Sequence, residues 1–263
     1  MHDRRGSSVD SVKNEVLEEL TLCVPFYQNG KMLARQIEEW NKYPEWVRII
    51  LVDDCSPDPA VPIVKRLASE KTRGQLEVYR TGVDLPWARE FCRNLMARVA
   101  VTPWLLMVDI DHIAPAETME KLKGMELPSG RWFRFRRMRV GKADETRKKD
   151  QIPPDSEYGE IHAHVDSYLC KSKHYWKVGG YNEKFCGVLG GGNEFLRRFE
   201  RYYPVDQMRK LFLHVYTRSV ISDASDTHCS RDTKPGKDLW RAMHNHGVGA
   251  PTEWLTLPWS RVL

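Results

Sequence analysis

The chain has 263 residues, of which 41% are hydrophobic and 29% charged, and its 41 Lys and Arg against 36 Asp and Glu leave a formal net charge of +5. This composition is typical of a globular protein, and a chain of this length buries enough apolar surface to fold without disulfides or a structural metal. No apolar run reaches the ~18 residues that a membrane span requires. The polar segment 1–10 lacks the apolar core of a signal peptide, and no Cys-x-x-Cys pair indicates a zinc ribbon. We therefore expect a cytoplasmic protein with no membrane partner.

Four apolar runs of strand length alternate with helical patterns in the first 112 residues. They span residues 22–26, 47–52, 76–79 and 104–108, and Asn29 is a plausible N-cap for the first helix. This alternation predicts an α/β fold with a mostly parallel sheet flanked by helices. The later strand patterns, at 132–140, 164–170 and 210–216, follow a different order and predict a mixed C-terminal half. Residues 1–20 form a polar tail with, at most, a short helix.

Carboxylates follow two of the predicted strands. Asp53 and Asp54 end the second strand, and Asp109 and Asp111 end the fourth. Ligands of parallel sheets bind beyond the carboxyl ends of the strands, so we expect these side chains to share one crevice. An Asp-x-Asp pair there can hold Mg²⁺ or Mn²⁺, or it can be a solvated turn. Asp53 and Asp54 can accept a hydrogen bond from a nucleobase or ribose, or can begin the turn that follows.

These motifs together resemble a known family. The segment 52–58 (VDDCSPD), the pair Arg93-Asn94 and the triplet 109–111 (DID) resemble the nucleotide-sugar glycosyltransferases of family 2, which have the GT-A fold. Residues 178–185 (VGGYNEKF) resemble a later segment of that family. The resemblance implies one catalytic domain over residues 21–263. Its nucleotide-binding half would span 21–112, and its acceptor half 113–263.

The resemblance also implies roles for individual residues. The nucleotide-sugar donor would contact six of them: Pro25, Tyr27, Asp53, Asp54, Arg93 and Asp109. A divalent metal, Mn²⁺ or Mg²⁺, would be bound by Asp109 and Asp111, with His228 completing its ligands. Transfer would be a direct displacement that inverts the anomeric carbon.

The base that accepts the proton of the acceptor hydroxyl is harder to assign. Members of the family usually carry an acidic pair at the start of a helix after a Gly-rich turn, where this chain has Gly191-Gly192-Asn193-Glu194. We expect Glu194 to be the base, with Asp166 as the next choice. Asp166 also belongs to the pattern His162-x-His164-x-Asp166, which is either a second metal site or the polar face of a strand.

The acceptor is indicated only by charge. Nine basic and two acidic residues lie between Arg131 and Lys149, and arginines alternate with aromatic residues at its start. Arg134, Arg136 and Arg137 could bind phosphates while the aromatic rings stack on bases, which suggests a nucleic-acid acceptor such as DNA with a hydroxymethylated base. The alternative is that the aromatic residues are core and the arginines are solvated. A saccharide or small-molecule acceptor therefore stays open.

Two other classes of function were weighed. A nucleotidyltransferase would need a Gly- and Arg-rich loop after the first strand, where this chain has Val24-Pro25-Phe26-Tyr27. A nucleic-acid-binding protein without enzymatic activity would leave the four strand-end carboxylates unexplained.

Overall fold

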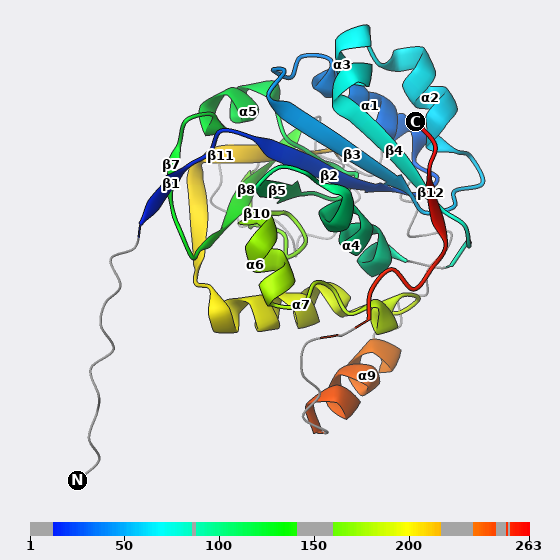
Figure 1. Ribbon diagram of the computed structural model, residues 1–263, viewed down its shortest axis with the longest axis vertical. Helices are drawn as coiled ribbons and strands as arrows, with labels where there is room; N and C mark the ends of the chain where they lie inside the picture. Colours follow the sequence, from blue (N-terminus) through cyan, green and yellow to red (C-terminus); the bar gives the residue numbers. More distant parts are fainter. Residues whose placement is uncertain (1–12, 86–87, 141–159, 217–233, 246–250, 252) are drawn as a thin grey trace.

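The computed structural model describes residues 13–85, 88–140, 160–216, 234–245, 251 and 253–263 (Figure 1). Within them, ten strands form one sheet: β2 (Leu20–Phe26), β3 (Val47–Asp53), β4 (Leu76–Thr81), β5 (Trp104–Met107), β6 (His112–Ile113), β8 (Trp132–Val140), β9 (Glu160–Ile161), β10 (Tyr168–Lys171), β11 (Val205–Tyr216) and β12 (Trp259–Arg261). Their order is β12-β4-β3-β2-β5-β10-β8-β11-β6, and β9 pairs with β8.

Strand direction divides the sheet into two parts. The neighbours β4, β3, β2 and β5 are all parallel, as the alternating pattern predicts. β10 runs antiparallel to both β5 and β8, while β12 and β6 pair antiparallel with β4 and β11. The predicted α/β fold with a parallel N-terminal part and a mixed C-terminal part is confirmed.

Helices cover both faces of the sheet (Figure 1). The described helices are α1 (Gly30–Trp40), α2 (Ala60–Leu67), α3 (Glu70–Gln75), α4 (Arg89–Val99), α5 (Ala116–Leu122), α6 (Ser172–Lys177), the 3-10 helix η2 (Glu183–Phe185), α7 (Gly191–Tyr202) and α9 (Lys234–Asn245). α1, α2 and α5 contribute to one buried apolar cluster, and α4, α6 and α7 to another on the opposite face. None of these helices is long and apolar enough to span a bilayer.

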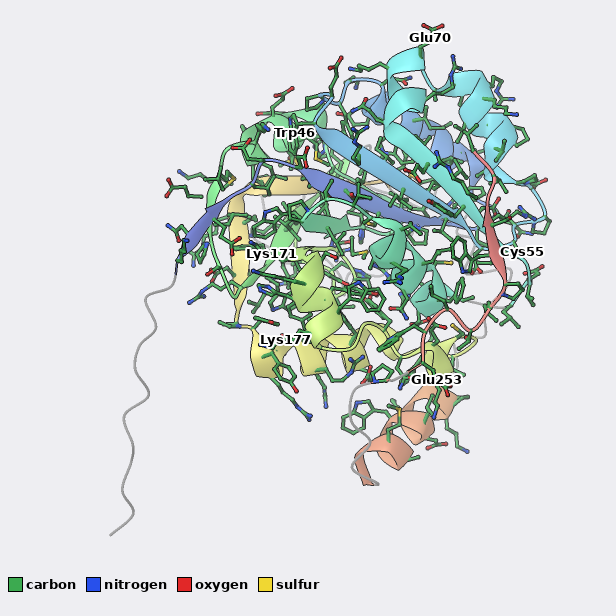
Figure 2. The ribbon with its side chains drawn as sticks, in the orientation of Figure 1. Trp46, Cys55, Glu70, Lys171, Lys177 and Glu253 are labelled. Carbon is green, nitrogen blue, oxygen red and sulfur yellow. The ribbon has the colours of Figure 1, made fainter. Side chains whose placement is uncertain are left out.

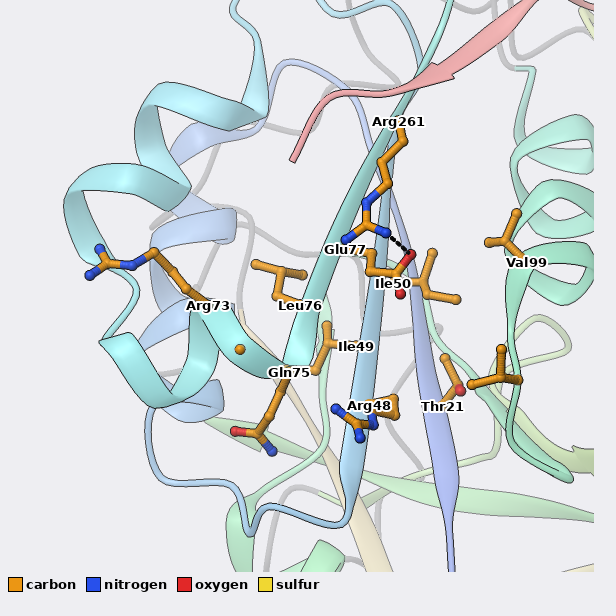
Figure 3. Close-up of a pocket in the computed structure, with 12 residues that line it drawn as sticks. Thr21, Arg48, Ile49, Ile50, Arg73, Gln75, Leu76, Glu77, Val99 and Arg261 are labelled. Atoms are coloured by element: carbon orange, nitrogen blue, oxygen red, sulfur yellow. Dashed lines mark ion pairs between the residues drawn. The ribbon is translucent and has the colours of Figure 1, made fainter.

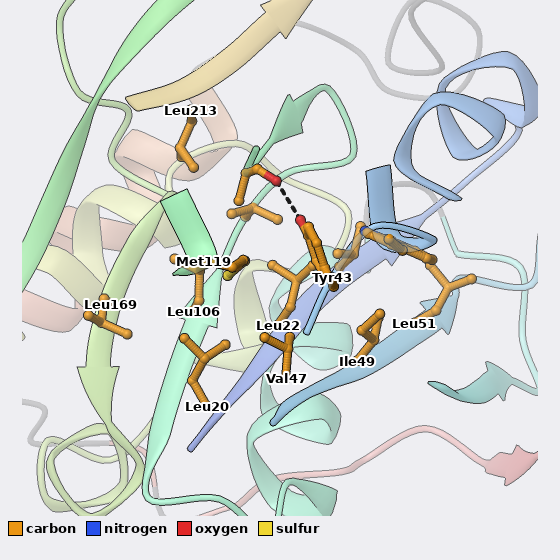
Figure 4. Close-up of a cluster of buried hydrophobic side chains, with 14 of the residues drawn as sticks. Leu20, Leu22, Tyr43, Val47, Ile49, Leu51, Leu106, Met119, Leu169 and Leu213 are labelled. Atoms are coloured by element: carbon orange, nitrogen blue, oxygen red, sulfur yellow. Dashed lines mark hydrogen bonds between the residues drawn. The ribbon is translucent and has the colours of Figure 1, made fainter. Parts of the chain in front are cut away.

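The first cluster shows how the sequence pattern becomes packing. Leu33, Ile37 and Trp40 lie on one face of α1 and are fully buried against the sheet. Asn29 caps this helix as predicted, because its side chain accepts a hydrogen bond from the Met32 N–H at 3.2 Å. Figure 4 shows the same cluster, in which the Tyr43 hydroxyl donates to the Ala114 carbonyl at 2.5 Å. Full burial of each large apolar side chain stabilises the fold by roughly 1.5–3 kcal/mol.

The N-terminal segment differs from expectation. Residues Asn14–Val16 form strand β1, which pairs antiparallel with β7 (Glu126–Pro128). Leu17 is fully buried, so the chain joins the fold before residue 21. The short helix allowed for in this segment is wrong for the part that the structure describes, because β7 supplies a pairing partner that periodicity cannot reveal.

Candidate active site

The candidate site lies at the carboxyl ends of β3, β2 and β5. Figure 2 marks the two edges of the sheet along β3, since Trp46 precedes this strand and Cys55 follows it at the other edge. Because β3, β2 and β5 are parallel neighbours, the strand-end carboxylates lie at one edge of the sheet. This is the place where open α/β sheets bind ligands.

Asp53 holds the turn after β3. Its Oδ1 accepts from the Ser56 N–H at 2.7 Å, and its Oδ2 accepts from the Ala60 N–H at 2.9 Å and from Arg80 at 2.8 Å. The residue is 1% exposed. Its carboxylate is therefore committed to protein donors, which corrects the expectation of a donor-binding Asp53 and supports the alternative that it begins the turn.

Asp54 occupies a different environment one residue later. Its Oδ2 accepts from the Ala88 N–H at 3.1 Å, and burial raises the pKa of this carboxyl to about 7 although that hydrogen bond opposes the shift. Pro25 and Tyr27 are half-buried at and beyond the end of the adjacent β2. Burial and the nearby Asp84 carboxylate raise the pKa of Tyr27 to about 12. The end of β3 and the end of β2 thus form one partly buried polar surface.

Asp109 is fixed by Arg93 and His164. The Arg93 guanidinium, fully buried in α4, donates to Asp109 Oδ1 at 2.5 Å, and His164 Nδ1 lies 3.2 Å from Oδ2. Burial alone would raise the pKa of Asp109, but Arg93 and His164 outweigh it and hold the pKa well below its usual range. Asp109 is therefore a carboxylate anion whose orientation is fixed by Arg93.

Potential metal ligands gather around this carboxylate. Ligand atoms of Asp109, His112 and His164 lie within 4.8 Å of one another, and the neighbouring Asp111 side chain is 53% exposed. Carboxylates with imidazole suit a divalent ion such as Mn²⁺. Within this set His112 is the least able to bind a metal, because both of its ring nitrogens have protein partners.

The hydrogen bonds of His112 define its role. Arg137 donates to Nε2 at 3.1 Å, so Nδ1 carries the proton and donates to the Ser167 hydroxyl at 2.6 Å. Burial lowers the pKa of His112 to about 4, which keeps the ring neutral. Its edge contacts the His164 ring with centroids 4.9 Å apart, so His112 supports the orientation of His164.

Glu194 does not have the environment expected of the base. It is buried in α7, where Arg198 Nε donates to Oε1 at 2.5 Å and Arg198 Nη2 donates to Oε2 at 2.7 Å. Arg198 also donates to the carbonyls of Val178 and Gly180, so the pair fastens the glycine turn to the helix. The prediction that Glu194 is the base is corrected, because both of its oxygens are committed to a structural ion pair.

The His162-x-His164-x-Asp166 pattern is not one face of a strand. Residues 165–166 form a turn, and β10 begins only at Tyr168 instead of at His164. The side chains consequently diverge: His164 faces Asp109, Asp166 faces Arg89 at 2.8 Å, and His162 is exposed. Neither alternative for this pattern is correct as stated, although His164 does join the possible metal ligands.

The basic strand β8 combines core and surface. Trp132, Phe133 and Phe135 are buried, which corrects the expectation of exposed stacking rings. Arg134 and Arg136 line a cavity of about 260 Å³ together with His162, Ala163 and Gln207. Arg137 donates to the His162 carbonyl at 2.8 Å as well as to His112, so it links this strand to the Asp109 environment.

Another cavity lies at the opposite edge of the sheet. It measures about 310 Å³ and includes Thr21, Arg48 and Leu76, which stand at the beginnings of β2, β3 and β4 (Figure 3). Arg261 pairs there with Glu77 at 3.3 Å. This cavity lies at the beginnings of the strands, whereas the candidate site lies at their carboxyl ends, so the cavity is not part of the candidate site.

The N-terminal part of the chain is similar in sequence to a known family. The profile of the family described as glycosyl transferase family 2 matches residues 21–125. Over those residues the chain is similar to that family. They contain Asp54, Arg93, Asp109 and Asp111, and thus the strand-end part of the site. Among curated proteins, none matches this chain.

Solved structures extend the likeness of the fold beyond that domain. S. aureus TarS, residues 1–349 in complex with UDP, is 14% identical with a TM-score of 0.54, over 76% of this chain and 60% of that one. A Pyrobaculum calidifontis mannosyltransferase in complex with GDP-Man and Mn²⁺ is 14% identical with a TM-score of 0.53, over 79% of this chain and 60% of that one. The catalytic domain of Drosophila β1,4-galactosyltransferase 7 is 13% identical with a TM-score of 0.51, over 86% of this chain and 80% of that one. The chain spans about three fifths of the first two, and its fold is the GT-A fold.

The predicted metal ligand His228 lies outside the described residues. A residue of the site that the sequence analysis missed is His112. His112 directly follows the Asp-x-Asp triplet, which is the one signal that could have indicated it. Arg89, on the first turn of α4, also carries no recognisable pattern, because its contact with Asp166 at 2.8 Å depends on the tertiary structure.

Proposed function

We propose that this protein transfers a sugar from a nucleotide-sugar donor to an acceptor hydroxyl. The observation that carries the proposal is the Asp109 carboxylate, fixed by Arg93 at the end of β5 beside the exposed Asp111. The UDP and GDP-Man complexes of proteins with the same fold support a nucleotide-sugar donor. Within the site, Pro25, Tyr27 and Asp54 would contact the nucleotide.

Asp109 and Asp111, with His164, would bind a divalent metal. His228, which lies outside the described residues, would complete the ligands. The Mn²⁺ complex of the mannosyltransferase supports this assignment. The ion would neutralise charge on the departing diphosphate. Arg93 holds Asp109 in place, and the transfer is a direct displacement that inverts the anomeric carbon.

For the acceptor we propose a phosphate-bearing polymer, with DNA carrying a hydroxymethylated base as the specific case. Arg134 and Arg136 line a cavity on the strand that also carries Arg137 to the Asp109 environment. Because guanidinium groups bind phosphates in a fixed geometry, this surface favours a polyanion over a neutral saccharide.

The donor experiment tests the reaction class. The purified chain is incubated with a panel of UDP-, GDP- and dTDP-sugars in Mn²⁺, Mg²⁺ or EDTA, and release of nucleoside diphosphate is measured. We expect release with at least one donor, loss of activity in EDTA and its recovery with Mn²⁺ or Mg²⁺. Full activity in EDTA would contradict the metal assignment, and release of sugar 1-phosphate, with transfer of the nucleoside monophosphate, would indicate a nucleotidyltransferase instead.

The acceptor experiment measures binding to duplex DNA over a salt series. Phosphate contacts predict a slope of log affinity against log salt of about −0.9 per contact. Arg134→Ala and Arg136→Ala should each make the slope shallower by about one contact, whereas Arg209→Ala, on the adjacent strand β11, should change it less. No binding at low salt would leave a saccharide or small-molecule acceptor.

A cytoplasmic location completes the proposal. Cys23, Cys92 and Cys170 are buried free thiols, as expected of a reducing compartment. A thiol reagent should label all six cysteines of the unfolded, unreduced protein. A protected pair would contradict this location.

A further inference from the structure

Two glycines at the start of α7 make room for carboxylates from elsewhere in the chain. A Cβ atom on Gly191 would lie 2.2 Å from Glu90 Oε1, and one on Gly192 would lie 2.3 Å from Asp166 Oδ1. Neither position could carry a side chain without displacing these groups. Glu90, from the first turn of α4, and Asp166, from the turn before β10, therefore occupy the space that side chains at the start of α7 would fill.

Glu90 stands out among the carboxylates of this region. Its Oε1 accepts from Arg89 at 3.2 Å, but its Oε2 has no hydrogen-bond partner, although the residue is 0% exposed. A buried polar atom without a partner is costly, and native proteins keep such atoms chiefly where they serve a function. Burial also raises the pKa of Glu90 to about 7, against the opposing charge of Arg89.

The other nearby carboxylates are committed. Asp166 accepts from Arg89 at 2.8 Å and from the Tyr181 hydroxyl at 3.2 Å, while both oxygens of Glu194 accept from Arg198. Among these three, Glu90 alone keeps an oxygen without a donor. That oxygen is thus the one that could still accept a hydrogen bond from a hydroxyl.

A chain of contacts connects Glu90 to the proposed donor site. Arg89 bridges Glu90 and Asp166, the Asp166 carbonyl accepts from Arg93 at 2.9 Å, and Arg93 donates to Asp109. Glu90 and Asp109 are thus connected through one network of charged side chains. Because Glu90 is 0% exposed, access of an acceptor to its Oε2 requires α7 to move at its glycine start.

We propose that Glu90 is the base of the transfer, and that Arg89 and Asp166 are positioning residues for it. This inference rests on the proposed glycosyl transfer. The acceptor oxygen bonds to the anomeric carbon while the bond from that carbon to the diphosphate oxygen breaks. The electron pair leaves with the nucleoside diphosphate. The hydroxyl proton moves to Glu90 Oε2 and from there to water.

The principal test is Glu90→Gln with steady-state kinetics. We expect kcat to fall about 10²- to 10⁴-fold, while the affinity for the donor, measured by calorimetry, stays within about threefold. Glu120→Gln, at an exposed position of α5, is the matched control and should leave kcat unchanged. Near-normal turnover by Glu90→Gln overturns the proposal, and so does equal loss of kcat and donor binding.

Two further variants separate catalysis from folding. Glu90→Ala should regain activity in formate, which can replace the missing carboxylate, whereas a purely structural role predicts no recovery. Gly191→Ala should lower kcat because its Cβ displaces the Glu90 carboxyl, while Gly74→Ala, which meets no atom within 4 Å, should not. Absence of formate rescue together with normal turnover by Gly191→Ala would overturn the proposal.

The dependence of kcat on pH distinguishes a catalytic role of Glu90 from a purely structural one. The wild-type kcat should fall as pH decreases through about 7, and this limb should disappear in Glu90→Gln. The charged and titratable groups that act on Glu90 are Arg89 and Asp166, with Cys92 and Cys186 nearby. A limb unchanged in Glu90→Gln contradicts the assignment. If the wild type releases no nucleoside diphosphate from any donor, it is the glycosyl-transfer proposal that fails.

Discussion

The ends of β3 and β5 carry the same kind of residue and use it differently. After β3, Asp53 is sealed by two backbone N–H groups and Arg80, and the next residue, Asp54, has a pKa raised to about 7. After β5, Asp109 is held by Arg93 and His164 and its pKa is lowered, while Asp111 is 53% exposed.

The difference shows that position at a strand end is only the first requirement for a ligand. Burial without a nearby cation raises the pKa of Asp54, whereas Arg93 and the neighbouring His164 lower the pKa of Asp109. One strand end is therefore suited to hydrogen bonds with a nucleotide, and the other to a cation. Four predictions test this contrast.

The largest effect is expected at the exposed carboxylate of β5. Asp111→Asn should lower kcat/KM by about 10²- to 10³-fold, because a proposed ligand of the metal that would neutralise the departing diphosphate is lost. The thermal midpoint should change little, since the side chain is 53% exposed. Asp58→Asn, in the exposed turn after β3, is the control and should retain activity. Full activity of Asp111→Asn would break the contrast between the two strand ends.

Arg93→Lys should affect both stability and activity. Arg93 is fully buried and donates to Asp109 and to the Asp166 carbonyl, and lysine cannot span both acceptors. We expect a loss of roughly 3–5 kcal/mol in the free energy of unfolding, measured in urea, and at least a tenfold loss of activity. Arg98→Lys, at an exposed position of the same helix, should do neither.

Asp54→Asn should reveal the environment of the β3 end through pH. Because the folded pKa is raised to about 7, the contribution of Asp54 to stability is complete below its unfolded value and is lost as pH rises through 7. The variant lacks this loss, so at pH 8 it should be more stable than the wild type by a difference on the order of 3 kcal/mol. Urea unfolding at pH 5 to 8 measures this. A difference that does not grow with pH would show that burial does not control Asp54.

The smallest effect is expected at the opposite edge. Arg48→Ala, in the cavity at the beginnings of β2, β3 and β4, should change transfer less than twofold. A large loss of activity would indicate that the functional site lies at the beginnings of the strands. The difference between Asp54 and Asp109 would then matter for folding and not for transfer.

Local pattern was sufficient for the parallel part of the sheet. The run from Val47 to Val52 appears in the structure as β3, and the face formed by Leu33, Ile37 and Trp40 is the buried face of α1. Both features depend on periodicity and capping, which neighbouring residues control. For the same reason Asp54, Arg93, Asp109 and Asp111 could be placed at one edge from sequence order and a family motif.

Tertiary structure decided which of the acidic residues are free to act. Nothing near Glu194 in the sequence distinguishes a base from half of an ion pair, and only the folding of Arg198 back onto the turn at Val178 and Gly180 assigns it. Likewise, His164 turns to Asp109 because residues 165–166 leave the strand. Glu90 meets Gly191 across about a hundred residues of chain. Sequence determined which chemical groups reach the edge of the sheet, and packing between distant segments determined their charge, their partners and their availability, because desolvation and ion pairing depend on distances that the chain order does not contain.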